Sequence, residues 1–156
     1  MNEPMDVPEG LRRDGHRLLQ VGGLLLLLAL LAGLAVPRFT VPRLGLSTHL
    51  LGITQGTFLL VGGLLWPKLR FTRSASRIGH ALAIYGCLAA WTANLLGAMW
   101  GAGNSMLPMA AGAARGSSIQ EAAIRVLLMS AALSLVTLAI LILWGLRRPP
   151  RAESSR

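Results

Sequence analysis

The chain has 156 residues, of which 53% are apolar and only 13% are charged, and its net charge is +9. This composition excludes an ordinary soluble domain, because the charged residues lie in short patches between long apolar runs. The basic residues stand at the ends of those runs without interleaved aromatic residues, which argues against a nucleic-acid-binding protein.

Four apolar runs approach or exceed the roughly 20 residues that a helix needs to cross a bilayer. We therefore expect an all-α membrane protein with one domain, a four-transmembrane-helix bundle over residues 16–147. Residues 1–15 are expected to form a polar tail, and residues 148–156 a basic tail. The spans are predicted at about residues 17–36, 47–66, 78–100 and 120–146.

The ends of the spans predict an orientation in the membrane. Pro37 closes the first span and Pro67 the second, because a helix rarely continues through a proline. Eleven of the 15 lysine and arginine residues lie in or directly beside the first tail, in the connection between the second and third spans, and in or directly beside the last tail. By the positive-inside rule, both termini are then expected to be cytoplasmic.

The second span begins with the most informative stretch of the chain, GLSTHLLGITQGTFLLVGG at residues 45–63. A polar side chain at membrane depth is costly, which makes His49 a functional candidate. Gly52 and Gly56 follow on the same helical face and leave a groove into which a flat ligand could press. The same spacing is the small-residue pattern by which membrane helices pack without a ligand, so both interpretations stay open here.

Two buried amides belong to the same half of the expected bundle. Gln55 lies on a different face from His49, about 9 Å further along the helix axis. Asn94, near the end of the third span, reaches a comparable depth, where an amide serves either as a contact between helices or as part of a site. The connection 101–118, which is rich in glycine, alanine and methionine, is expected to fold back over the end of the bundle at which the third span finishes.

Several classes of chemistry have no residues to support them. The spans contain no catalytic serine–histidine–aspartate set, no carboxylate pair, no phosphate loop and no nucleotide site. The missing buried carboxylate argues against a proton-coupled exporter. One cysteine, Cys87, excludes a multi-cysteine metal site, and His16 and His80 are expected to be interfacial. A lone histidine beside a glycine groove is suited instead to be an axial ligand of haem.

Two stretches, PRLGLSTHLLGITQGTFL and ANLLGAMWGAGNSMLP, resemble the hydroxylaminobenzene mutase family of small bacterial membrane proteins. The similarity spans roughly residues 15–146. It implies an isomerase of the bacterial inner membrane that converts a small aromatic hydroxylamine into an aminophenol. That reaction is redox-neutral and needs no nucleotide or cosubstrate.

The second span also resembles, more distantly, the styrene oxide isomerases, which hold ferric haem b through a histidine. The match of their pattern to Thr48-His49 and Gln55-Gly56 implies that His49 is the metal ligand. We then expect Gly52 and Gly56 to border the cofactor, and Gln55 and Asn94 to act in catalysis. Gln55 replaces the asparagine that is usual in both families, and the tyrosine of the epoxide isomerases has no counterpart near Asn94. The comparison also suggests a homo-oligomer, namely a trimer.

The alternative is a small haem-binding or structural membrane subunit with no reaction of its own. An electron-transfer module needs two axial histidines, and His80 is the only other histidine within a span, expected near the opposite face. A low-spin spectrum would favour that module, whereas a high-spin ferric spectrum would favour an open catalytic iron. A purely structural subunit would show no Soret band.

Overall fold

The structure is a computed structural model that describes residues 9–69 and 71–147. Within this part of the chain all regular structure is helical, and the expected bundle is confirmed. Four helices are long and apolar enough to cross a membrane. They are α1 (Glu9–Ala35), α2 (Pro42–Leu65), α3 (Arg73–Trp100) and α5 (Ser118–Leu146), and the short α4 (Pro108–Ala111) lies between α3 and α5.

The long helices begin before the apolar runs that predicted them. α1 begins at Glu9, so residues 9–15 of the expected polar tail are helical. A helix satisfies its own backbone hydrogen bonds and can continue into the polar interface, whereas hydropathy marks only its lipid-embedded part. α3 likewise begins at Arg73, where the Thr72 hydroxyl accepts a hydrogen bond from the Ala75 amide. The remaining tail residues, 1–8 and 148–156, lie outside the described residues.

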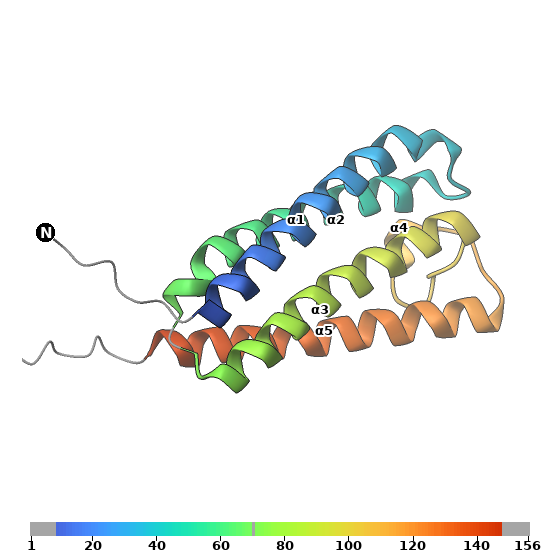
Figure 1. The fold of residues 1–156 in the computed structure, drawn as a ribbon. Coiled ribbons are helices and arrows are strands. Elements are labelled where there is room, and N and C mark those ends of the chain that lie inside the picture. Colours follow the sequence, from blue (N-terminus) through green and yellow to red (C-terminus); the bar gives the residue numbers. More distant parts are fainter. Residues whose placement is uncertain (1–8, 70, 148–156) are drawn as a thin grey trace, which may run out of the picture.

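The bundle consists of two helix pairs (Figure 1). α1 packs along α2, α3 packs along α5, and the contact of α2 with α3 joins the pairs. The first turn of α1, the first turn of α3 and the last turn of α5 lie at one end, called the basic end, and α4 lies at the other, called the lid end. The membrane side that each end faces remains a prediction.

Glycines let the backbones of α1 and α2 approach each other closely. A Cβ atom added to Gly22 would lie 2.9 Å from the carbonyl oxygen of Gly56, and one added to Gly15 would lie 2.7 Å from that of Gly63. Helix association in lipid relies on such packing, because lipid tails are as apolar as the side chains. The small-residue pattern of α2 therefore serves to pack α2 against α1.

We expect Gly22→Ala to destabilise the bundle by about 1–3 kcal/mol, because the new methyl group meets backbone atoms that cannot rotate away. Gly23→Ala is the matched control, since a Cβ atom there meets nothing within 4 Å. That change should be neutral or stabilising by about 0.5–1 kcal/mol. Thermal unfolding of both variants in detergent measures the difference, and equal melting temperatures would contradict the tight α1–α2 contact.

Candidate functional site

The imidazole of His49 lies in the seam between α1 and α2 and is half-buried. Its Nδ1 atom is 2.8 Å from the carbonyl oxygen of Ala29. Because a carbonyl oxygen only accepts hydrogen bonds, Nδ1 donates to it, and in the neutral imidazole the lone pair is then on Nε2. This is the tautomer of a metal-ligating histidine, whose other ring nitrogen commonly donates to a backbone carbonyl.

Gly33 on α1 makes the room for this ring. A Cβ atom on Gly33 would lie 2.6 Å from Nδ1 of His49 and 2.8 Å from its Cε1. Sequence analysis did not single out Gly33, because its role follows only from the pairing of α1 with α2. Ala29 and Gly33 are four residues apart and together support the imidazole from one face of α1.

The groove expected beside Gly52 and Gly56 is filled in this structure. A Cβ atom on Gly52 would lie 2.6 Å from Cβ of Ala29 and 2.7 Å from Nε1 of Trp91. On Gly56 it would lie 2.8 Å from Cγ of Leu26. Side chains of α1 and α3 therefore occupy the space in which a flat cofactor was expected beside these glycines.

Gln55 lies on another side of α2 and is only 7% exposed. Its side chain lines a cavity of about 490 Å³ between α2, α3 and α5. Its Oε1 atom has no hydrogen-bond partner among the described residues. The other lining residues are almost entirely apolar, namely Thr54, Phe58, Cys87, Leu135, Ala139, Ile142 and Leu143. A buried acceptor without a donor costs about 1–3 kcal/mol, so this cavity is suited to a ligand that brings a donor.

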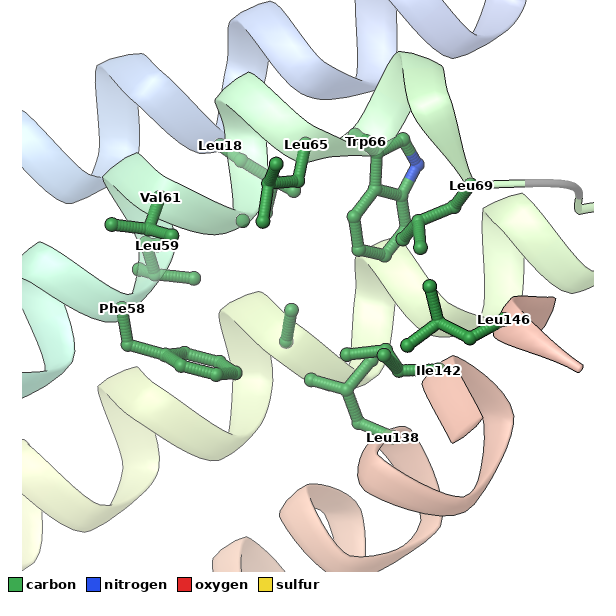
Figure 2. A pocket seen from close by; sticks show the side chains of 12 residues that line it. Leu18, Phe58, Leu59, Val61, Leu65, Trp66, Leu69, Leu138, Ile142 and Leu146 are labelled. Carbon is green, nitrogen blue, oxygen red and sulfur yellow. The ribbon is translucent and has the colours of Figure 1, made fainter. Parts of the chain in front are cut away.

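A second cavity, of about 240 Å³, adjoins the first and shares Phe58 and Ile142 with it. Figure 2 shows Phe58 at one end of this cavity and Trp66 and Leu69 at the other, with Leu138 on the α5 side. Aliphatic and aromatic side chains dominate the lining of both cavities. The space next to Gln55 thus borders a second apolar cavity, whose lining favours an aromatic ring over water.

Asn94 lies between α2 and α3 and is 4% exposed. Its Nδ2 donates to the carbonyl oxygen of Ala90 at 3.1 Å, and its Oδ1 accepts from the Ser47 hydroxyl at 3.2 Å. The bond to Ala90 lies within α3, and the bond from Ser47 joins α2 to α3. The hydroxyl of Ser47 is the polar partner that sequence analysis did not identify, since a serine on an apolar helix gives no distinctive signal.

The three predicted side chains therefore have different neighbours. His49 is held by α1, Gln55 lines the cavity beside α3 and α5, and Asn94 bonds to Ser47. No hydrogen bond among the described residues joins any two of these three side chains.

The connection at the lid end folds back onto the bundle, as expected, and Glu121 on α5 holds it there. Its Oε1 accepts from the amides of Gly103 at 2.8 Å and Asn104 at 3.3 Å, and also from Gly116 at 3.4 Å. Its Oε2 accepts from the amide and hydroxyl of Ser105 at 3.2 and 3.0 Å. One carboxylate thus satisfies donors from both sides of α4.

We expect Glu121→Ala to release this connection, because the amides of Gly103, Asn104 and Ser105 lose their common acceptor. The protection of these amides in hydrogen exchange should fall by at least about tenfold, corresponding to 1–3 kcal/mol of lost local stability. Gln120→Ala is the control, since Gln120 bonds only to the Ser117 end of the connection. Unchanged protection at the three amides would contradict the role of Glu121.

Comparison with known proteins places these features in a family. A family model described as styrene oxide isomerase matches residues 14–147. Hydroxylaminobenzene mutase HabB from Ectopseudomonas oleovorans is 46% identical over 140 residues, which cover 90% of this chain and 85% of that protein. Hydroxylaminobenzene mutase HabA from the same organism is 39% identical over 127 residues, covering 81% and 94%. No solved structure matches.

Proposed function

The chain belongs to the styrene oxide isomerase family, and we propose that it is a mutase that rearranges small aryl hydroxylamines, such as hydroxylaminobenzene, to aminophenols. That the chain is a membrane isomerase follows from the family and from its four apolar helices. The substrate is inferred from the names of the two related mutases. Within the structure, the observation that carries the proposal is the buried, unpartnered Oε1 of Gln55 in an otherwise apolar cavity.

An aryl hydroxylamine matches this cavity chemically. Its ring is apolar and suits Phe58 and Ile142, while its N–H and O–H groups are the donors that Oε1 of Gln55 lacks. In the rearrangement the N–O bond breaks and a C–O bond forms at a ring carbon. The proton of that carbon is then lost and nitrogen gains one, so the composition does not change.

The side chains of the cavity supply binding, orientation and exclusion of water. Positive charge spreads into the ring as the N–O bond breaks, and the carbonyl dipole of Gln55 presents its negative end to that charge. The apolar walls keep bulk water from capturing the cation before the hydroxyl group returns. We assign Asn94 a positioning role, because it acts on the site only through the α2–α3 contact with Ser47.

We propose that the imidazole of His49 would hold ferric haem b. The neutral imidazole, with Nδ1 donating to Ala29 and the lone pair on Nε2, fits that role. When bound, the iron would supply a Lewis acid that polarises the N–O bond of the substrate. The closed spaces at Gly52 and Gly56 leave no room for the ring there, so these glycines are not part of the proposal.

We also propose that the chain works as a homo-oligomer in the bacterial inner membrane, with its basic end in the cytoplasm. His49 and Gln55 face different neighbours around α2, so one pocket that uses both requires a second copy. The family resemblance suggests a trimer. The lysine and arginine residues concentrated at the basic end support the orientation.

The direct test is to purify the full chain in mild detergent, record its absorption spectrum and incubate the same sample with phenylhydroxylamine. We expect aminophenol to form without any added oxidant or reductant, and chromatography measures it. Styrene oxide is the comparison substrate. Conversion of the epoxide without conversion of the hydroxylamine would contradict the proposed substrate while leaving the isomerase class intact.

A further inference from the structure

A polar cavity at the basic end takes no part in the proposed reaction. It measures about 840 Å³ and lies between the first turns of α1 and α3. Two arginine pairs line it, Arg13 with Arg17 on α1 and Arg73 with Arg77 on α3. Residues four apart share one face of a helix, so each helix presents two guanidinium groups to the same space.

The four arginines outnumber the two carboxylates that line the same cavity, those of Glu9 and Asp14. Within residues 9–69 and 71–147, none of the four guanidinium groups forms an ion pair. Asp14, which also lines the cavity, accepts a hydrogen bond at 2.8 Å from the Ser76 hydroxyl. That hydroxyl accepts in turn from Nε1 of the buried Trp66 at 3.0 Å. The chain of bonds ties α1, α3 and the end of α2 together and occupies one oxygen of Asp14.

His80 adds a polar atom without a hydrogen-bond partner to the same cavity. Its Nε2 atom is buried and has no partner among the described residues, and the residue belongs to the lining. Buried polar atoms in native structures almost always have a partner, so a polar occupant is expected. With four guanidinium groups against the carboxylates of Glu9 and Asp14, the field in the cavity favours an anion.

We propose that this cavity binds a phosphate group, and specifically the headgroup phosphate of an anionic membrane lipid. Guanidinium groups match phosphate oxygens with paired, charge-assisted hydrogen bonds. The cavity lies at the ends of membrane-crossing helices, where lipid headgroups are found, and basic pockets between such helices bind acidic lipids. The bound phosphate would crosslink α1 and α3 at the end where α2 joins them.

The experiment uses the full chain in detergent and native mass spectrometry with added phosphatidylglycerol or phosphatidylcholine. Wild-type protein should retain phosphatidylglycerol in preference to phosphatidylcholine. The double variant Arg17→Gln/Arg77→Gln should lose phosphatidylglycerol adducts by about tenfold or more, since each arginine near a headgroup contributes roughly 1 kcal/mol. Arg12→Gln/Arg147→Gln is the matched control, because Arg12 in the first turn of α1 and Arg147 after the last turn of α5 carry the same charge at the same end but do not line the cavity.

A second arm separates the two sources of phosphate. Inorganic phosphate is titrated into lipid-free protein while the melting temperature is followed. A rise in wild type and control, absent in Arg17→Gln/Arg77→Gln, without selective retention of phosphatidylglycerol, would identify a free anion as the occupant of the same site. Three results would overturn the proposal. The cavity variant could retain as much phosphatidylglycerol as the wild type, or the matched control could lose as much of it as the cavity variant. The third is a wild-type protein that responds to neither phosphatidylglycerol nor inorganic phosphate.

Discussion

Replacing His49 with alanine is expected to remove the Soret band and to lower aminophenol formation at least about 100-fold, because Lewis-acid stabilisation by a metal supplies several kcal/mol. The prediction rests on the tautomer that Ala29 imposes on the imidazole. Absorption spectra and phenylhydroxylamine turnover, measured on the same preparation, test it.

Two further variants sharpen this result. His16→Ala removes an exposed imidazole at the basic end and should change neither the spectrum nor the rate. Gly33→Ala retains the His49 side chain but adds a methyl group that would lie 2.6 Å from Nδ1, so the ring has to shift. It should weaken haem binding by about 10–100-fold, as loss of a ligand's hydrogen-bonded support typically does. A haem-free His49→Ala protein with full activity would refute the ligand assignment.

Replacing Gln55 with leucine is expected to lower kcat/KM for phenylhydroxylamine by about 100-fold, the typical cost of removing one positioned polar group from a reacting centre. The same change should leave the protein equally stable or more stable by about 1 kcal/mol. The reason is that the wild-type Oε1 is buried without a partner, and leucine has no polar group to desolvate. Initial rates and thermal unfolding measure the two effects separately.

The opposite signs of these effects distinguish a functional amide from a structural one. If Gln55 mainly held helices together, Gln55→Leu would lower stability and activity in parallel. Gln55→Asn keeps the amide with one methylene less and should retain more activity than leucine, with a changed preference among ring-substituted substrates. A leucine variant that turns over substrate at the wild-type rate would remove Gln55 from the proposed site.

The sequence shows at which position along a helix each candidate site residue lies, but not which neighbouring helix its side chain faces. His49 and Gln55 were recognisable because polar side chains are rare in apolar runs. The support of His49 by Ala29 and Gly33 was not, since both belong to the first span and carry no polar side chain. The sequence could not show what fills the space beside Gly52, because a glycine leaves the same gap for a ligand as for a side chain such as that of Trp91.

The sequence by itself determined that four helices cross the membrane, because a backbone in lipid must satisfy its own hydrogen bonds and only long apolar runs are stable there. Only the tertiary structure decided which way each helix is turned, and so which neighbour each polar side chain meets. In a soluble bundle the contrast between polar and apolar faces gives that rotation. In this protein both the lipid-facing and the core-facing side chains are mainly apolar, so close packing at residues such as Gly22, Gly33 and Gly56 fixes it.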